Sequence, residues 1–404
     1  MTAAAPRKGV GLLVLLLGAA VFLNYVDRGA MGIAAPLMTG ELRLSPEAFG
    51  IAFSAFFWIY APAQLVVGWL VDRFSVYRLI ALGVLLWGAS TLLMGFAGGF
   101  TSLVVLRIML GIGETVAFPG ASKIIARYVP AEGRGMANAA LALGIALGPA
   151  AGTLAGGFIL ASYGWRAIFL VFGIVSLLWL LPWYFAVPRE KGHAAPDMAR
   201  VPVSNLLGRW PLWSMSIAHI ASNYVFYFLL AWLPLFLTKS RGLPIGEMTM
   251  IATLGYAVQA VAAFAFGSWS DRWTRAGRSE ANIRRAMMFG GQFAAAAAVF
   301  ALPYATTPVA LAILLCVAGA ATGALSLNTY AVAQMFSGPR AAGTWVGIQN
   351  AIGNLSGIVG PIVTGIIVKQ AGFSMACWVT AAVALFGALW WVWGVPEIRQ
   401  IELD

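Results

Sequence analysis

Four ionisable residues lie inside stretches that are otherwise apolar: Asp27 and Arg28 in "FLNYVDRGAM", and Arg107 and Glu114 in "LRIMLGIGE". A charge in the hydrocarbon of a bilayer costs several kcal/mol, and the residues that carry one there usually have a function. A guanidinium stays charged and can bind a carboxylate through two parallel hydrogen bonds, whereas a carboxylate in a poorly solvated site can gain and lose a proton. We therefore predict that one or both arginines bind an anionic substrate and that Asp27 and Glu114 carry a coupled proton.

The spacing of these residues limits how they can meet. Arg107 and Glu114 are seven residues apart, so they share one face of a helix about 10 Å apart along its axis. Asp27 and Arg28 are adjacent and point about 100° apart, so at most one of them faces a central cavity and the other faces a neighbouring helix. An ion-pair network that only pins the first helix to the fourth is the structural alternative, and it is compatible with a transport role.

The composition indicates that the apolar stretches are membrane-spanning helices. Of 404 residues, 61% are hydrophobic and only 10% are charged, against about a quarter charged in soluble domains. The formal net charge is +11, but the basic residues lie in short gaps between apolar runs, which indicates membrane topology and not nucleic-acid binding. The two cysteines and two histidines have neither a disulfide nor a metal-ligand pattern, and we expect no cofactor.

Twelve apolar windows are each long enough to span a bilayer, and both termini are predicted to be cytoplasmic. The first window is preceded by Arg7 and Lys8 and is interpreted as a retained helix, not as a cleaved signal. Most loop lysines and arginines fall in alternate gaps, and the opposite gaps hold only Arg43, Arg166, Lys239, Arg241 and Lys369. The windows are 10–37, 46–71, 77–98, 100–127, 134–161, 165–186, 209–239, 246–270, 283–303, 307–336, 342–370 and 373–394.

The chain contains an internal repeat that divides it into two halves. "NYVDR" at Asn24 returns as "NYVFY" at Asn223, and "GWLVDR" at 68–73 returns as "GSWSDR" at 267–272, with the same offset (223 − 24 = 267 − 68 = 199). Duplicated helical units are typical of transporters with a midplane site between the halves. We predict an all-α protein with a six-helix bundle at 1–186, a cytoplasmic linker at 187–208 and a second bundle at 209–404, with the buried charges in the first half only.

These motifs resemble the major facilitator superfamily. "GWLVDRFSVYR" from Gly68 is similar to its loop between helices 2 and 3, and "LRIMLGIGE" to its helix 4 motif. More narrowly, the chain resembles the anion:cation symporter branch, which includes bacterial hexuronate and galactonate carriers and sialin-type transporters. The stretches that match the branch are "NYVDR", "FPGASKIIARYVPAEGRGMA" at 118–137, "GWRAIF" at 164–169, "NYVFYFLLAWLP" at 223–234 and "NAIGNLSGIVGPIVTG" at 350–365.

The resemblance implies proton-coupled import of an organic anion, commonly a sugar acid, by a cell-membrane protein of bacterial inner-membrane type. Asp27 and Glu114 match the branch's protonation residues, and its other site positions match arginine, tyrosine and asparagine residues here. Together with polar residues on other cavity helices, the predicted substrate-binding set is Arg28, Arg107, Tyr25, Tyr60, Gln64, Asn223, Tyr224, Tyr227, Asn350 and Asn354.

One stretch departs from relatives that handle polyhydroxylated acids. The fifth window reads "NAALALGIALGPAAG", without a polar side chain between Asn138 and Thr153. A hydroxylated substrate would lose hydrogen bonds against that wall. A short or aromatic carboxylate is therefore favoured, although polar residues on other helices, such as Gln259, keep a sugar acid open.

A gate is expected at the cytoplasmic ends of the second and eighth windows. In the superfamily, an aspartate at the position of Asp72 pairs across this face and locks the outward-open state. Asp271 and Arg272 are the repeat copy of Asp72 and Arg73, and Arg340 would lie at the start of the eleventh window. The alternative is that these residues are solvated helix ends.

Two other functions are alternatives to anion symport. An exporter of drugs or metabolites would keep the fold, but two buried arginines suit an anion better than a lipophilic cation. A membrane enzyme or receptor is disfavoured, because the chain has no nucleotide loop, metal cluster or nucleophile and base set. The expected partners are a small organic anion, protons and membrane lipid, with no nucleic acid, and the chain is expected to be a monomer; sodium coupling remains an alternative.

Overall fold

The structure is a computed structural model that describes residues 10–129, 134–186 and 203–402. Every element in these ranges is helical. Most of the expected linker, 187–202, lies outside the described residues, as do the side chains of Asp72 and Arg340.

The first half consists of helices whose starts follow local sequence signals. Ser45 caps the second helix by accepting a hydrogen bond from the N–H of Ala48 at 3.2 Å, and Pro46 occupies its first turn, where no backbone donor is needed. The helices are α1 (Val10–Glu41), α2 (Pro46–Arg73), α3 (Val76–Met94), α4 (Phe100–Glu114), α5 (Ala117–Tyr128), α6 (Arg134–Tyr163), α7 (Trp165–Leu178) and α8 (Leu180–Ala186).

The second half contains two very long helices that each bend at a glycine. The backbone of Gly338 has φ 63° and that of Gly372 has φ 79°, a left-handed conformation that glycine adopts without strain. The elements are α9 (Val203–Leu207), α10 (Trp210–Leu235) with a π-helical turn (Phe236–Ser240), α11 (Ile245–Arg275), α12 (Glu280–Ala301) with a 3-10 turn (Leu302–Tyr304), α13 (Pro308–Gly353) and α14 (Leu355–Trp393).

Within the described residues, ten helical stretches are long and apolar enough to cross a membrane. One of them, 341–393, has 53 residues and would be about 80 Å long, more than twice the thickness of the bilayer's hydrocarbon core. The left-handed Gly372 divides this stretch, so it offers two crossings and not one. The number of twelve crossings and the cytoplasmic location of the termini stay predictions.

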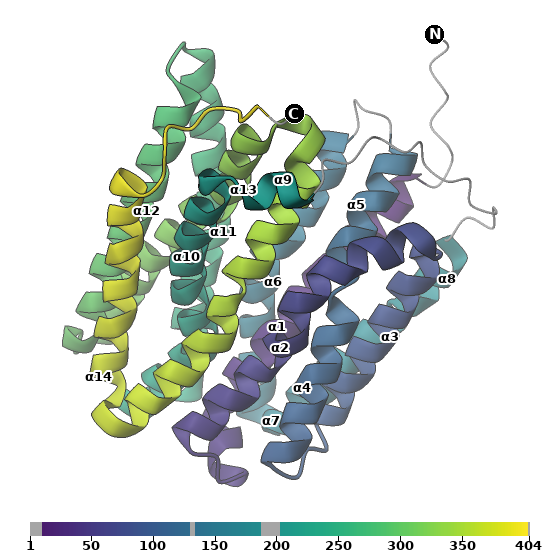
Figure 1. The fold of residues 1–404 in the computed structure, drawn as a ribbon. Helices are drawn as coiled ribbons and strands as arrows, with labels where there is room; N and C mark the ends of the chain where they lie inside the picture. The colour runs from purple at the N-terminus through teal and green to yellow at the C-terminus, as the bar shows by residue number, and fades with distance from the viewer. Residues whose placement is uncertain (1–9, 130–133, 187–202, 403–404) are drawn as a thin grey trace.

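The two halves lie side by side, with α1–α8 drawn in purple to blue and α10–α14 in teal to yellow (Figure 1). Contacts between them join α1 to α10, α2 to α14 and α6 to α11. Small residues allow this close approach: a Cβ atom on Gly32 would lie 2.1 Å from the Leu230 carbonyl oxygen, and one on Gly50 would lie 2.3 Å from that of Pro361.

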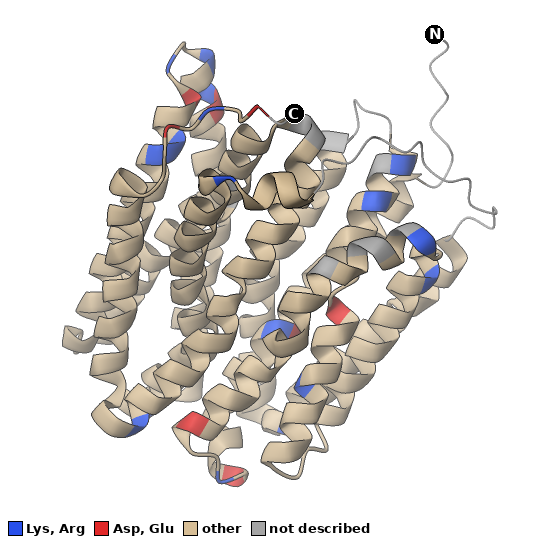
Figure 2. Cartoon of the chain, in the orientation of Figure 1, with Lys and Arg blue, Asp and Glu red and all other residues tan. Residues whose placement is uncertain are grey.

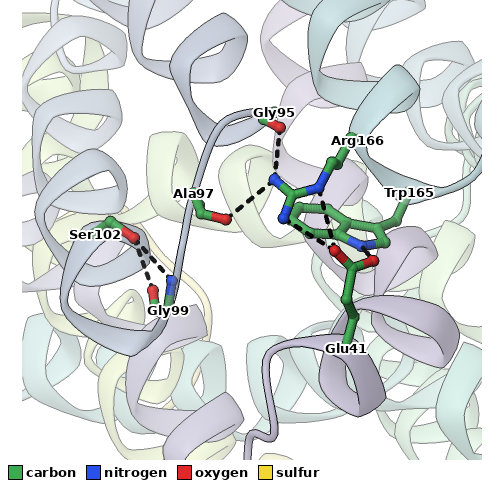
Figure 3. A network of polar contacts seen from close by, with 7 residues as sticks. All are labelled: Glu41, Gly95, Ala97, Gly99, Ser102, Trp165 and Arg166. Atoms are coloured by element: carbon green, nitrogen blue, oxygen red, sulfur yellow. Dashed lines mark hydrogen bonds and ion pairs between the residues drawn. The ribbon is translucent and has the colours of Figure 1, made fainter.

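Charged residues gather at the two ends of the bundle, and only a few lie between them (Figure 2). At one end, Arg166 at the start of α7 donates to the carbonyls of Gly95 and Ala97 at 2.9 and 3.1 Å and to the Glu41 carboxylate at 3.0 Å. Trp165 donates to the other Glu41 oxygen at 2.6 Å. This network, shown in Figure 3, ties the end of α1 and the loop after α3 to the start of α7, and it gives the "GWRAIF" motif a structural role.

Candidate functional site

The centre of the site is a buried ion pair between α1 and α4. Arg28 Nε donates to Glu114 Oε2 at 2.7 Å, and the side chains are only 6% and 0% exposed. Helix α4 ends at Glu114, and α5 begins at Ala117. Of the adjacent residues Asp27 and Arg28, Arg28 is therefore the one that faces α4, in the fourth expected span.

Asp27 points to a different neighbour. Its Oδ2 accepts a hydrogen bond of 2.8 Å from the hydroxyl of Ser176 on α7, and the residue is 1% exposed. Its Oδ1 has no hydrogen-bond partner among the described residues. The prediction that Asp27 and Arg28 face different directions is therefore met, but Asp27 makes no ion pair with either arginine in the described part of the chain.

Aromatic rings surround the Arg28 guanidinium. Its central carbon lies 4.5 Å from the ring centre of Tyr60, 4.9 Å from that of Tyr25 and 5.1 Å from that of Phe56. Ring faces attract cations, and the attraction is stronger where water is excluded. The rings therefore help to keep a charged guanidinium in the bundle, while its Nη2 donor has no partner among the described groups.

Arg107 is the second buried cation, and it is only partly satisfied. Its Nη2 donates to the Phe53 carbonyl of α2 at 3.0 Å, and its central carbon lies 4.9 and 5.2 Å from the rings of Phe53 and Phe56. Arg107 Nε and Nη1 have no hydrogen-bond partner among the described residues, although the residue is 1% exposed. Phe56 contacts both guanidiniums, so two cations with unused donors lie close to one ring. Such donors can bind an anion.

The second half supplies neutral polar groups. The Tyr227 hydroxyl donates to Asn354 Oδ1 at 2.5 Å, and Asn354 Nδ2 donates to the Asn350 carbonyl at 2.8 Å. Tyr330 donates to Asn350 Oδ1 at 3.2 Å. The rings of Tyr227 and Phe57 pack with centres 4.6 Å apart, which places this hydrogen-bond chain against α2 of the first half.

Three predicted binding residues lie outside these contacts. Tyr224 is buried and packs beside Gly360, Asn223 is half-buried, and Gln64 is half-buried with an Nε2 donor that has no partner among the described groups. The structure does not connect them directly to the four charges.

The structure describes only some of the predicted gate residues. Arg73, Asp271 and Arg272 are exposed at the ends of α2 and α11. The side chains of Asp72 and Arg340 lie outside the part of the chain that the structure describes, so a pairing that involves them stays a prediction.

Sequence reasoning missed several residues of the site. Ser176 lies in the apolar run "VFGIVSLLWL", and its isolated polarity in a membrane helix was the available signal. Phe53 and Phe56 were missed because an aromatic residue in an apolar window carries no sign that its ring faces a cation. Tyr330 was missed because nothing local distinguishes it from an interface tyrosine.

Comparisons with known proteins agree with this architecture. A family model described as the Major Facilitator Superfamily matches residues 17–279 and 242–401. The chain is 29% identical to the probable sulfoacetate transporter SauU of Cupriavidus necator, over 91% of this chain and 90% of that protein. It is 28% identical to the probable galactarate/D-glucarate transporter GudP of Bacillus subtilis, over 97% and 93%.

The fold is also similar to that of a solved structure, a bacterial homologue of the human lysosomal transporter Spinster described as inward-facing and occupied. The TM-score is 0.84 with 20% identity, over 98% of each chain. At this identity the likeness concerns the fold alone. The apolar helices and the family match confirm the predictions of a multi-pass membrane protein and of a transporter rather than an enzyme. The chain belongs to the Major Facilitator Superfamily.

Proposed function

We propose that the protein imports a small organic anion together with protons by alternating access. The observation that carries the proposal is the buried Arg28–Glu114 pair, next to donors of Arg28 and Arg107 that have no partner among the described residues. The similarity to SauU and GudP, which are described as probable transporters of organic anions, supports an anionic substrate.

Coupling follows from competition for one guanidinium. An anion that binds Arg28 and Arg107 draws Arg28 away from Glu114. A buried carboxylate that loses its cationic partner is strongly destabilised as an ion, and it takes up a proton instead. Proton and substrate then occupy the site together, which is the requirement for symport.

The role of Asp27 is distinct from that of Glu114. Its carboxylate is held by Ser176 and not by an arginine, so substrate binding does not remove a cation from it. We propose that Asp27 is a second protonation residue, whose proton uptake would break or reverse the Ser176 hydrogen bond.

The substrate is proposed to be a short, sparsely hydroxylated carboxylate or related anion. The wall formed by α6 offers no polar side chain between Asn138 and Thr153, whereas Tyr227 and the two asparagines of the opposite half offer a few neutral hydrogen bonds. This arrangement suits one anionic group at the arginines and few hydroxyls elsewhere.

We propose twelve crossings with cytoplasmic termini, in the two bundles predicted from the sequence, and a rocking motion between them. At the N-terminal end of α2, Glu47 Oε1 forms an ion pair of 2.8 Å with Nζ of Lys369 on α14, which joins the two halves. Nearby, the rings of Phe49 and Trp232 lie 5.1 Å apart. In the proposed rocking motion, these contacts would separate when the Asp72 and Asp271 regions pair at the other end.

The test is transport by purified protein in liposomes. Small carboxylates are first screened for thermal stabilisation, and the compounds that bind are followed into liposomes under an imposed pH gradient or an imposed sodium gradient. Accumulation driven by the pH gradient and abolished by Glu114→Gln supports the proposal. Accumulation driven by sodium alone contradicts proton coupling, and stabilisation by cationic drugs without any by carboxylates contradicts the anion.

A further inference from the structure

A cavity of about 890 Å³ lies in the second half between α11, α12 and α13, away from the four buried charges. Its volume is in the range of cavities that hold one organic ligand. We call it the α11–α12 groove. Its apolar lining includes Phe266, Trp269 and Trp273 of α11, Gly290 and Ala294 of α12, and Ala321 of α13.

The groove lies on the outer side of the bundle. Helix α12 packs against α11, α13 and α14 of its own half, and Figure 1 shows it on the side away from the first half. Of the lining residues, Trp269 is 46% exposed, Trp273 41% and Val317 41%. In a membrane protein, such exposed apolar side chains on a peripheral helix face lipid.

One basic residue lines an end of the groove, and two more lie on the last turn of α11. Arg278 lines it, and its guanidinium lies 5.8 Å from the ring centre of Trp273; within the described residues it has no ion-pair partner. Arg272 and Arg275 are exposed on the last turn of α11. The nearby Glu280 is already paired with Arg284 at 2.7 Å, so an excess of positive charge remains.

We propose that the α11–α12 groove binds one phospholipid with an anionic headgroup. An acyl chain would lie along the tryptophans and small residues, and the phosphate would contact Arg278 and the start of α12, where Ser279 caps a helix of 22 residues. A helix N-terminus attracts a phosphate, and arginine binds it through paired hydrogen bonds. The basic end is the one that the loop charges assign to the cytoplasm, where anionic lipids attract basic segments. This inference does not depend on the proposed substrate or coupling ion.

The test measures lipid binding by the full chain in detergent, by native mass spectrometry and thermal unfolding. The probes are dioleoyl phosphatidylglycerol and dioleoyl phosphatidylcholine, which differ only in the headgroup. We expect one phosphatidylglycerol to be retained and to raise the unfolding temperature more than phosphatidylcholine does. Arg278→Gln should weaken phosphatidylglycerol binding about fivefold, whereas Arg275→Gln, outside the groove lining, should change it less than twofold.

A second pair of variants tests the groove itself. A Cβ atom on Gly290 would meet nothing within 4 Å, so Gly290→Leu fills the groove without a backbone clash. Gly246, near the other end of α11, is equally open, and Gly246→Leu is the matched control. We expect Gly290→Leu to abolish retention of the lipid and Gly246→Leu to leave it unchanged.

Three results would overturn the proposal: equal binding of the two lipids, equal losses in Arg278→Gln and Arg275→Gln, or full retention of phosphatidylglycerol by Gly290→Leu. If Gly290→Leu does not elute as a folded protein, a phosphatidylglycerol with a photoreactive acyl chain decides the question in the unaltered chain. Labelling within 266–273 and 290–294 supports the groove, and labelling elsewhere alone rejects it.

Discussion

Replacement of Glu114 by glutamine removes one charge from a pair that is almost completely buried. The Arg28 Nε and Glu114 Oε2 atoms are 2.7 Å apart, and the two side chains are 6% and 0% exposed. At an effective dielectric constant of 20, a pair at this distance attracts by about 6 kcal/mol before desolvation is counted. Loss of one partner of a buried pair costs about 3–5 kcal/mol, because the other charge is left uncompensated. The rings of Tyr60 and Tyr25 still contact the cation, so we expect about 3 kcal/mol.

The assay is a double-mutant cycle on unfolding in mixed detergent micelles. Glu114→Gln, Arg28→Gln and the double variant are compared with the unaltered chain under conditions in which unfolding is reversible. We expect the double variant to be more stable than the sum of the single losses predicts, with a coupling energy of roughly 2 kcal/mol. Asp27→Asn is the control, since Asp27 adjoins Arg28 in sequence but bonds to Ser176, and it should show almost no coupling to Arg28→Gln.

A coupling energy below about 0.5 kcal/mol, the limit of additivity for independent sites, would refute the reasoning. It would mean that the two side chains do not form a charged pair in the folded protein. The same outcome would remove the physical basis of substrate competition for Arg28, even if Glu114→Gln also stops transport.

Three further perturbations test other contacts. Ser176→Ala should destabilise the protein by about 1.5–3 kcal/mol, because it removes the hydrogen bond to the buried Asp27 carboxylate. Ser176→Thr, which keeps the hydroxyl, should recover part of the lost stability in the same unfolding assay. An unchanged stability of Ser176→Ala would contradict the contact. Glu47→Gln should cost less than about 1 kcal/mol, because its partner Lys369 is 59% exposed, and the loss should shrink in high salt; a loss that salt does not change would argue for a different role. Arg166→Lys should lower stability by about 1–2 kcal/mol, since lysine cannot reach two carbonyls and a carboxylate at once; an unchanged unfolding curve would show that the fork-shaped contact is dispensable.

The helices of the first half were predictable because their ends carry local signals. The windows 46–71 and 77–98 correspond to α2 (Pro46–Arg73) and α3 (Val76–Met94), and a serine precedes each of these helices. A serine at this position favours the start of a helix whatever helices pack around it, although only Ser45 makes the capping hydrogen bond. The apolar runs then had to be membrane helices, since so few charged residues cannot cover a soluble core.

The ends of helices in the second half were not predictable to the same degree. The windows 307–336, 342–370 and 373–394 fall on α13 and α14, which join the expected helices through the left-handed glycines Gly338 and Gly372. A glycine in an apolar run is also compatible with close helix packing, and only the tertiary structure shows which role it has. The interruption at Asn354 has no strong sequence signal either.

The charged residues of the site were predictable because a charge in the membrane is energetically costly. Which of them pair with each other was not predictable. Charges in apolar runs stand out, and Asp27, Arg28, Arg107 and Glu114 are all buried. Adjacent residues on a helix point to different neighbours, yet periodicity cannot say which one faces α4 and which one faces α7. The choice depends on Ser176, which offers Asp27 a donor from α7, and on the position of Glu114 at the end of α4.

The asymmetry of the two halves bears on the rocking motion that we propose between them. The four buried charges belong to the first half, whereas the second half presents Tyr227 and Asn354, joined by a neutral hydrogen bond. A charged group shared between halves would have to be desolvated again each time they separate, at a cost of several kcal/mol per ion. Neutral groups exchange protein partners for water at a net cost near 1 kcal/mol each. In the mechanism that we propose, an anion held by the arginines would therefore link the halves through weak bonds at its far end, and the halves would separate without exposing an unpaired buried charge.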